Sequence, residues 1–355
     1  MRMNPAQAFV VIPCIIFFPP NLMRAAEMEN TSLRSPWDAR AITLTDAPYD
    51  CPAPIPMSSD LLIGSYYNDA HNSIIDEAKK EAFDAIQEPF TRFGRGLVKA
   101  ADNYRSTGSR AAAACVISLL YGAAKERVLA GKMESFQAFY EQGWCLSSWT
   151  IAYLKVRGSN LASAEETEQI LKWFKNMAED NRSYYDSKSR NPNSDAHNNH
   201  LYWAGLAVSA AGVACNDHKL FSWGMDAYKE GAERIREDGT LPAEMERAGR
   251  ALHYHVYALG SLILLAEFGE ANGMNLYAER NYAIKRLVAR CVSGLQDPSF
   301  FAEHTRVAQV PEVLEGEAIG WAQPYVRRFP DPEISALLAQ AKWVGYTTWG
   351  GLPPE

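Results

Sequence analysis

A succession of helical segments dominates this sequence and limits the folds that it can adopt. Apolar residues recur at helical spacing over residues 76–125, 135–157 and 164–181, with a break near Ser106–Ser109. Stretches rich in Ala and Leu are frequent, whereas long alternating runs of Val, Ile and Thr are scarce. Helices of roughly 12 to 20 residues joined by short turns predict stacked antiparallel helix pairs in an all-α domain.

The rest of the chain follows the same pattern less regularly. Residues 260–268 and 276–292 predict further helices, residues 297–311 are irregular, and residues 311–328 predict a last helix. Residues 27–65 are rich in Pro, Ser and Asp, so we expect extended structure packed on the outside. With 355 residues, of which 47% are hydrophobic and 22% charged, the chain can bury a sizeable core.

The N-terminus is typical of a secretory signal peptide. Arg2 gives a short positive start, residues 8–18 are apolar, and the pair Ala25–Ala26 follows. The apolar run is too short for a stable membrane anchor. We therefore expect a signal peptide at 1–26 and a single catalytic domain at 27–355, exported to the periplasm or the medium.

Charge and cysteine content narrow the possible ligands. Removal of residues 1–26 leaves 33 basic and 42 acidic residues, a formal charge of −9, which argues against a nucleic-acid partner. Five cysteines remain, so at least one thiol is free in the exported protein. No CxxC pair or His/Cys cluster supports a zinc site, and we expect no metal and no cofactor.

Two motifs hold the candidate functional residues. Ser194–Trp203 reads SDAHNNHLYW and places Asn199 and His200 at the expected entry to a helix, where asparagine also acts as a cap. In Glu244–Tyr257 the side chains of interest are spaced by three, four and three residues, which predicts one shared face of a helix. These side chains are Arg247, Arg250, Tyr254 and Tyr257.

This combination of residues favours the removal of a proton next to a carboxylate. A tyrosine becomes a usable base near neutral pH only if its pKa is moved down, and Arg247 is two helical turns from Tyr254. Asn199 and His200 would bind a carboxylate opposite the phenol. The alternative is that aromatic and histidine residues at helical spacing belong to the core or its rim.

The motif NNHxYW at 198–203, the turn EDG at 237–239 and ExxRxxxxLHYxxYA at 244–258 together resemble the alginate lyases of polysaccharide lyase family 5, the poly(mannuronate) lyases. The resemblance covers roughly residues 50–328. It implies an incomplete (α/α) barrel with an open substrate groove. It also implies a Cys51–Cys115 disulfide and the catalytic set Asn199, His200, Arg247 and Tyr254.

The resemblance also suggests residues that bind the substrate. Tyr140 and Trp144 resemble an aromatic pair that lines the groove, although aromatic stripes at helical spacing are more often core. Tyr67 belongs to a polar aromatic cluster, residues 66–71, in a loop that can close over a sugar chain. The remaining substrate-binding candidates are Trp203, Arg250 and Tyr257, and the pair Arg327 and Arg328 offers further positive charge.

The implied reaction is a β-elimination in a 4-linked uronate polymer. Asn199, His200 and Arg247 would neutralise the carboxylate beside C5, which stabilises the enolate-like intermediate. Tyr254 would take the C5 proton and return a proton to the departing O4, since both lie on one face of mannuronate. His200 is an alternative base.

Two other functions compete with this interpretation. A glycoside hydrolase would need two carboxylates flanking the bond, and Glu244 with Glu246 is the best available pair. A non-catalytic alginate-handling protein of an export complex would keep the groove without needing Tyr254. In each case we expect an anionic polysaccharide as the partner and a monomeric protein.

Overall fold

The computed structural model of this protein describes residues 31–69, 74–191 and 194–354. The chain divides into two compact units, residues 1–32 and residues 33–355. Only Thr31 and Ser32 of the first unit are described, so the account below concerns the second unit. The predicted signal peptide at 1–26 lies outside the described residues.

The second unit is built from helices, and the described part of the chain contains isolated β-bridges but no β-strand. The α-helices are α2 (Glu77–Thr107), α3 (Arg110–Lys125), α4 (Phe136–Val156), α5 (Ala164–Lys188), α6 (Asn199–Cys215), α7 (His218–Arg234), α8 (Pro242–Met245), α9 (Ala251–Ala271), α10 (Glu279–Gln296), α11 (Ser299–Thr305), α12 (Ala322–Arg328) and α13 (Pro332–Gln340). The all-α prediction is confirmed.

The predicted helix boundaries in the first half of the chain agree with local chemistry. α2 ends at Gly108, which adopts a left-handed φ of 75° that glycine tolerates without strain. Ser109 then caps α3 by accepting a hydrogen bond from the backbone of Ala112. Ser135 and Ser163 cap α4 and α5 in the same way. The expected break near residues 106–109 is therefore confirmed.

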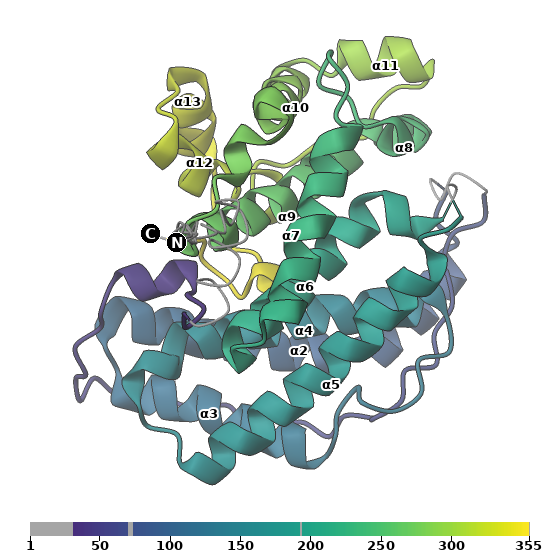
Figure 1. The fold of residues 1–355 in the computed structure, drawn as a ribbon. Helices are drawn as coiled ribbons and strands as arrows, with labels where there is room; N and C mark the ends of the chain where they lie inside the picture. The colour runs from purple at the N-terminus through teal and green to yellow at the C-terminus, as the bar shows by residue number, and fades with distance from the viewer. Residues whose placement is uncertain (1–30, 70–73, 192–193, 355) are drawn as a thin grey trace, which may run out of the picture. The chain divides into compact units, whose positions relative to one another are not determined.

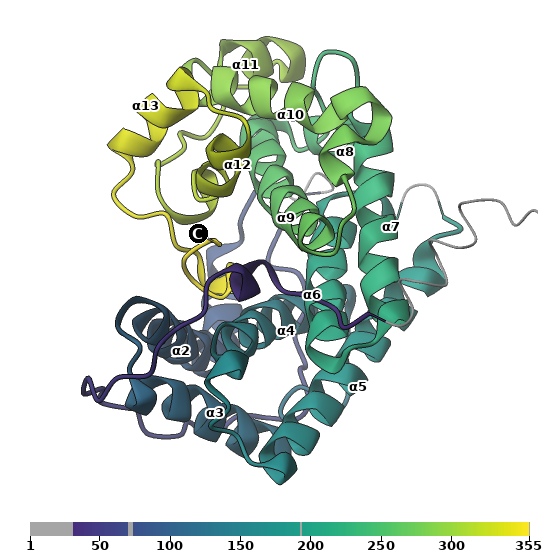
Figure 2. The ribbon, with the colours of Figure 1, turned by 60° about the vertical axis from the view of Figure 1, so that its left-hand side comes forward.

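Helix α6 separates two hydrophobic cores. Ala207 and Ala211 face a core formed largely by α2, α3, α4 and α5, whereas Leu206 and Ala210 face one formed largely by α7, α9 and α10. Figures 1 and 2 show α2 to α5 gathered on one side of α6 and α7, and α8 to α13 on the other. Because both sides of α6 are covered, its sequence is apolar all round.

Helix α9 is the central helix of the second core. Within the described residues, one stretch, Ala248–Ala271, is long and apolar enough to cross a membrane by length and composition alone. In the fold, 94% of its apolar window is buried against other helices. This burial explains the composition of α9 as that of a core helix.

Two predicted helices differ from the structure. Residues 244–257 do not form one helix, because α8 ends at Met245 and a 3₁₀ turn, η4 (Ala248–Arg250), precedes α9. Ala248 adopts a left-handed φ of 49°, which no α-helix accommodates.

The predicted helix at 311–328 is also wrong. Within it lie only a short 3₁₀ turn, η6 (Gly316–Ala318), and α12, while α11 forms in the segment expected to be irregular. The backbone of Gly316 pairs with Trp343 instead of a helical neighbour. Gly320 lies so close to the Trp349 ring that a Cβ atom there would be 2.3 Å from it. Packing against the C-terminal segment therefore replaces helix in this region.

A disulfide bond connects the segment that precedes α2 to α3. It joins Cys51 to Cys115, the pair that the family resemblance implies. Among the described cysteines, Cys145, Cys215 and Cys291 are free thiols.

Candidate active site

A cavity of about 170 Å³ lies where the N-terminal ends of α4, α6 and α9 meet. Its wall combines aromatic side chains with a few charged groups. The lining residues are Tyr66, Tyr67, Phe136, Gln137, Tyr140, Trp144, His200, Arg247, Arg250, His253, Tyr254, Tyr257, Glu317 and Tyr346. The structure thus brings together the two motifs at 194–203 and 244–257. It also brings both motifs next to the aromatic pair on α4, which is distant from them in the sequence.

The electrostatic character of this cavity suits an anion. The N-terminus of a helix carries partial positive charge, and three helices begin here. Two guanidinium groups, of Arg247 and Arg250, line the wall, compared with one carboxylate, of Glu317. A negatively charged ligand is therefore favoured over a neutral one.

Tyr254 is surrounded by groups that act on its hydroxyl. Its Oη lies 3.0 Å from Oη of Tyr67, and the Arg247 guanidinium carbon lies 3.4 Å from the centre of its ring. Arg250 is farther away, at 5.8 Å from the same ring centre. Burial raises the pKa of Tyr254 above its ordinary value, and Arg247 and Arg250 offset only part of this effect.

Arg247 and Arg250 lower the Tyr254 pKa as expected, but in the unliganded protein burial outweighs them and the net shift is upward. Tyr254 is 8% exposed, and removal of a phenolate from water costs more than nearby positive charge returns. The hydroxyl is consequently protonated at neutral pH.

The position of Arg247 depends on a turn that the helical pattern did not predict. Arg247 precedes η4, and Gln309 braces this turn by donating from Nε2 to the carbonyl of Ala248 at 3.0 Å. The same side chain accepts a hydrogen bond from the backbone of Leu252 at 3.0 Å. The backbone of Val310 adds a bond to the carbonyl of Gly249 at 2.8 Å. These contacts hold Arg247 over the Tyr254 ring.

His200 has a defined tautomer. Oδ1 of Asn198 accepts the backbone N–H of His200 at 2.9 Å, so the ring nitrogen Nδ1, at 2.8 Å from the same oxygen, has to be a donor. Burial, with a contribution from Arg247, lowers the pKa of His200 to about 3. The ring is therefore neutral at pH 7, and Nε2 carries a lone pair that can accept a proton or a hydrogen bond.

Asn199 is buried behind the cavity and does not line it. Its backbone N–H and its side-chain Nδ2 donate to the two carboxylate oxygens of Glu244, at 2.8 and 2.9 Å. Its Oδ1 accepts from the hydroxyl of Tyr140 at 3.0 Å. In the unliganded structure Asn199 therefore positions Tyr140 and the start of α6 instead of presenting its amide to a ligand.

Glu244 is a buried acid with an unusual proton affinity. Burial raises its pKa to about 7, while the two bonds from Asn199 and the charge of Arg247 act in the opposite direction. It is 1% exposed and does not line the cavity. Its ionised form is the one that can accept both hydrogen bonds from Asn199.

Most of the aromatic substrate-binding candidates line the cavity, and one of them packs behind it. Tyr140 packs against Trp144, with ring centres 4.2 Å apart, and against His200 at 4.0 Å. Tyr140 and Trp144 both line the cavity, as do Tyr67, Arg250 and Tyr257. Trp203 does not: it is 1% exposed and packs behind Tyr257, with ring centres 4.7 Å apart. Trp203 as a direct substrate contact is therefore corrected to a core residue.

Several lining residues were not predicted from the sequence. Tyr346 and Glu317 come from the C-terminal segment, and Phe136 and Gln137 come from the first turn of α4. His253 stands inside the LHY motif, and its Nδ1 lies 3.2 Å from a carboxylate oxygen of Glu312. The only signal for His253 in the sequence is its place next to Tyr254. This signal is weak, because consecutive residues of a helix point in different directions.

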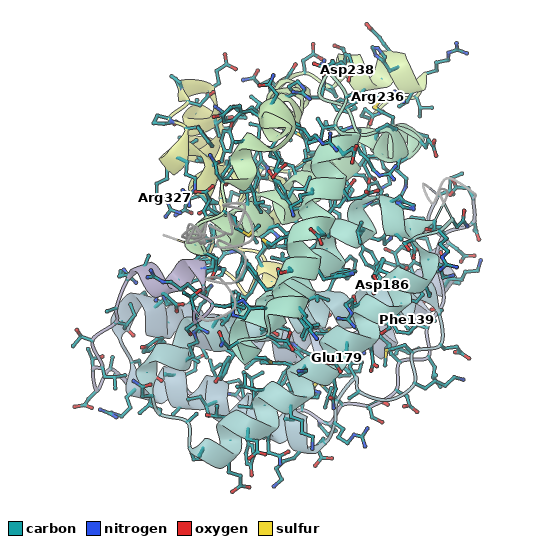
Figure 3. The ribbon with its side chains drawn as sticks, in the orientation of Figure 1. Phe139, Glu179, Asp186, Arg236, Asp238 and Arg327 are labelled. Carbon is teal, nitrogen blue, oxygen red and sulfur yellow. A yellow bond between two sulfur atoms is a disulfide. The ribbon has the colours of Figure 1, made fainter. Side chains whose placement is uncertain are left out.

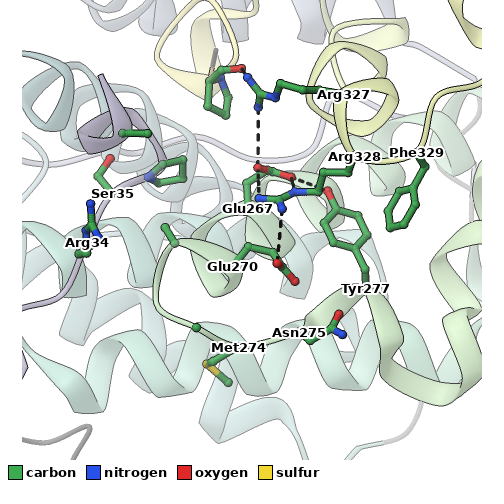
Figure 4. A pocket seen from close by; sticks show the side chains of 15 residues that line it. Arg34, Ser35, Glu267, Glu270, Met274, Asn275, Tyr277, Arg327, Arg328 and Phe329 are labelled. Atoms are coloured by element: carbon green, nitrogen blue, oxygen red, sulfur yellow. Dashed lines mark hydrogen bonds and ion pairs between the residues drawn. The ribbon is translucent and has the colours of Figure 1, made fainter. Parts of the chain in front are cut away.

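Arg327 and Arg328 lie outside this cavity and line a second hollow of about 840 Å³. Figure 4 shows both guanidinium groups directed at Glu267, which accepts from Arg328 Nε at 2.6 Å and from Tyr277 Oη at 2.8 Å. Figure 3 shows Arg327 well apart from Phe139, a residue of the α4 end that borders the cavity. These arginines balance a buried carboxylate and are not placed to bind a ligand in the cavity.

Comparisons with known proteins agree with this geometry. The family model described as Alginate lyase matches residues 63–301. A polysaccharide lyase of Stenotrophomonas maltophilia is 38% identical over 284 residues, which cover 79% of this chain and 82% of that protein. An alginate lyase of Pseudomonas syringae pv. syringae is 33% identical over 288 residues, covering 79% of this chain and 75% of that protein.

Solved structures support the fold. The crystal structure of alginate lyase A1-III from Sphingomonas species A1 matches with a TM-score of 0.71 at 20% identity, covering 93% of this chain and 92% of that one. A variant of the same enzyme complexed with a tetrasaccharide matches with a TM-score of 0.75. The helix pairs described above therefore form an incomplete (α/α) barrel, and this chain belongs to the alginate lyase family.

Proposed function

We propose that this protein depolymerises alginate by β-elimination at the 4-O-glycosidic bond and that it prefers mannuronate blocks. The observation that carries the proposal is the Tyr254 hydroxyl in the cavity wall, with the Arg247 guanidinium against its ring and the neutral His200 nearby. The names of the related proteins and the anion-favouring wall support the substrate class.

Binding of the uronate carboxylate is the first requirement. Arg247 and Arg250 supply two fixed positive charges, which reduce the electron density that otherwise opposes loss of the C5 proton. The helix ends of α6 and α9 add partial charge of the same sign. A carboxylate in the cavity also raises the pKa of His200, because an opposite charge favours the imidazolium form.

The elimination carries a proton from C5 to O4 in two transfers and moves two electron pairs, one into the new double bond and one onto O4. The C5–H bond breaks and its electrons form the C4=C5 double bond, while the C4–O4 bond breaks and O4 takes a proton. Tyr254 accepts the C5 proton and donates a proton to O4, with Arg247 stabilising negative charge on the phenol oxygen. In mannuronate both atoms lie on one face of the ring, so one residue serves both transfers.

His200 stays the alternative base. Its Nε2 lone pair is available at neutral pH, but a pKa of about 3 makes the free imidazole a weak proton acceptor. Asn199 acts through Tyr140 and through the start of α6, and not by direct contact. The catalytic set is therefore Tyr254, His200 and Arg247, with Asn199 as a positioning residue.

The hydrolase alternative has little support from the site. Glycoside hydrolysis uses a pair of carboxylates on either side of the bond. Glu244 is buried behind Asn199, Glu246 is exposed outside the cavity, and Glu317 is the one carboxylate among the described lining residues. An alginate-handling protein without activity would keep the same cavity, and only a turnover assay separates it from a lyase.

The cellular setting is part of the proposal. Residues 1–26 would be removed as a signal peptide, and residues 27–355 would act as one catalytic domain in the periplasm or the medium, as a monomer and without a membrane anchor. Alginate is a large polymer and is not expected to enter the cytoplasm intact. An exported enzyme would meet it outside the cytoplasm.

Product analysis tests the function. The protein is incubated with polymannuronate, polyguluronate and mixed alginate, and the ultraviolet absorbance of the unsaturated uronate is followed. We expect a rise that is fastest on polymannuronate, together with an unsaturated sugar at the new non-reducing end. New reducing ends without absorbance would indicate a hydrolase, and no new ends on any substrate would indicate a non-catalytic protein.

A further inference from the structure

An exposed apolar surface borders the catalytic cavity. Four of the nine large hydrophobic side chains that are exposed among the described residues lie on two segments next to the cavity wall. We call this group the outer rim; it consists of Val307, Val310, Val313 and Trp343. Its side chains are 46 to 58% exposed, although burial of such groups is favourable.

Trp343 is the largest residue of the outer rim, and its ring packs against the backbone. A Cβ atom at position 345 would lie 2.6 Å from Cε2 and Cζ2 of its indole, so the ring rests directly on the backbone of Gly345. Glycine is required there because any side chain would displace the ring. The indole is 54% exposed, so it is held in place on one side and open to solvent on another.

Trp343 belongs to a segment that contributes to the cavity wall. Tyr346, which follows Gly345, lines the cavity, and so does Glu317, which follows Gly316. The backbone N–H of Gly316 donates to the carbonyl of Trp343 at 2.9 Å, which fixes the two segments side by side. Trp343 is therefore anchored to both elements that form this part of the wall.

The valines lie on a second segment, which is bonded to residues in or next to the cavity wall. The backbone of Val310 is bonded to Gly249, the neighbour of the lining residue Arg250. Glu312, between Val310 and Val313, has a carboxylate oxygen 3.2 Å from Nδ1 of the lining residue His253. The segment 307–313 is thus fixed to the turn that holds Arg247, and its apolar side chains face solvent beside it.

A polymer has to leave the cavity across its rim. A cavity of about 170 Å³ is small compared with a polymer, so most uronate rings of a bound chain lie outside it. The flat C–H faces of sugar rings pack well on an indole, which offers a large rigid apolar surface. The exposed indole and the polymer are therefore complementary at the place where they meet.

We propose that Trp343 is the stacking platform of an additional subsite, which binds a uronate ring of the alginate chain outside the catalytic cavity. This inference rests on the proposed function. The subsite contributes affinity for long chains and takes no part in the proton transfers, because Trp343 does not line the cavity.

The test compares substrates of two lengths. Trp343→Ala is expected to raise KM on polymannuronate about five- to tenfold, the range for loss of one aromatic stacking contact, with kcat unchanged. On a mannuronate disaccharide, the shortest chain with a bond to cleave, at most one ring lies beyond the reaction centre, so kcat/KM is expected to stay at the wild-type value. Trp343→Phe keeps a flat ring and should recover most of the polymer affinity.

A matched control is available on another surface. Tyr282 is 42% exposed and shares its Lys285 contact with Phe329, which lines the second hollow. Tyr282→Ala should leave both substrates unaffected. If Trp343→Ala does not fold, as judged by thermal melting, Val313→Asp is used, since a carboxylate on the outer rim should repel the polyanion and raise the polymer KM at low salt.

The possible results distinguish failure of the proposed subsite from failure of the proposed function. An unchanged polymer KM in an active, folded Trp343→Ala protein overturns the subsite. Equal losses on the disaccharide and the polymer also overturn it, because the residue would then act on the cavity itself. If the wild-type protein cleaves none of the alginates, the proposed function fails, and the subsite fails with it.

Discussion

The guanidinium of Arg247 lies 3.4 Å from the centre of the Tyr254 ring, although the two residues belong to different structural elements. Arg247 stands before the 3₁₀ turn at Ala248–Arg250, and Tyr254 is in the first turn of α9. Stacking of this kind stabilises negative charge that develops on the phenol oxygen. The proposed proton transfer therefore depends on this pair.

Removal of the guanidinium should reduce the rate far more than affinity. Arg247→Ala is expected to lower kcat by about a hundredfold or more, the usual loss for a group that stabilises transition-state charge. Arg247→Lys should recover only part of the rate, because a lysine lacks the planar group that covers the ring. Steady-state kinetics and melting curves for both variants check this, and a stable Arg247→Ala protein with wild-type kcat would refute it.

Gln309 should matter for activity although it lies outside the motifs. Its side chain makes hydrogen bonds to Ala248 and to the backbone of Leu252, so Gln309→Ala releases the turn that positions Arg247. We expect kcat to fall about tenfold, since small displacements of a catalytic group are costly.

Gln340→Ala is the control for the Gln309 variant. Gln340 is an exposed glutamine of α13 that bonds only to the backbone of its own helix, at Ala336. It should retain full activity. Equal activity of the two variants would show that the turn does not depend on Gln309.

Glu244 should control activity through Asn199. In Glu244→Gln one of the two Asn199 donors loses its acceptor, and an unsatisfied buried donor costs about 1 to 3 kcal/mol. We expect a kcat about tenfold lower with little change in KM, whereas Glu246→Gln, exposed two residues later, should behave as wild type.

The pH profile separates this positioning role from a general loss of stability. Because the pKa of Glu244 is about 7, the wild-type rate should fall as the pH drops below 7 and the carboxylate is protonated. The glutamine variant should lack this limb. An unaltered acid limb in the variant would assign the titration to another group.

A second buried acid makes a prediction about stability. Glu141 accepts hydrogen bonds from Gln137 and Gln87, and burial raises its pKa to about 8. The folded protein then binds a proton that the unfolded chain releases near pH 4.5, so this contribution to stability is complete below that pH and is lost as the pH rises to 8. One pKa unit corresponds to about 1.4 kcal/mol.

Glu141→Gln should therefore flatten the decline in stability between pH 5 and pH 8. Denaturant unfolding at both pH values measures the effect, with Glu165→Gln as an exposed control. A decline as steep in Glu141→Gln as in the wild type would mean that Glu141 is ionised throughout this range.

The first half of the fold was predictable because its signals are local. Serine caps and the glycine at 108 set the ends of α2 to α5, and the apolar period gives their length. The turn at 248–250 was not predictable, because the left-handed conformation of Ala248 is stabilised by Gln309, 61 residues away. A pattern within residues 244–257 contains no information about that contact.

Part of the site could not be predicted from hydrophobic periodicity, for a related reason. Helix α6 is covered on all sides, so its sequence has no polar face that would distinguish Trp203, in the core, from His200, in the cavity wall. Tyr346 and Glu317 reach the wall through packing of the C-terminal segment on α9, which leaves no local signal. The family resemblance indicated the central residues, and packing decided which of them face the cavity.

The most direct test of the account is the turnover of Tyr254→Phe on polymannuronate, measured together with its affinity for the same polymer. The variant keeps the ring under Arg247 and loses only the hydroxyl that moves the proton. The account predicts that kcat falls at least about a hundredfold, the usual contribution of acid–base catalysis, while affinity stays within about twofold. Retention of more than a tenth of the wild-type kcat would contradict it and would transfer the role of the base to another residue, with His200 the first to examine.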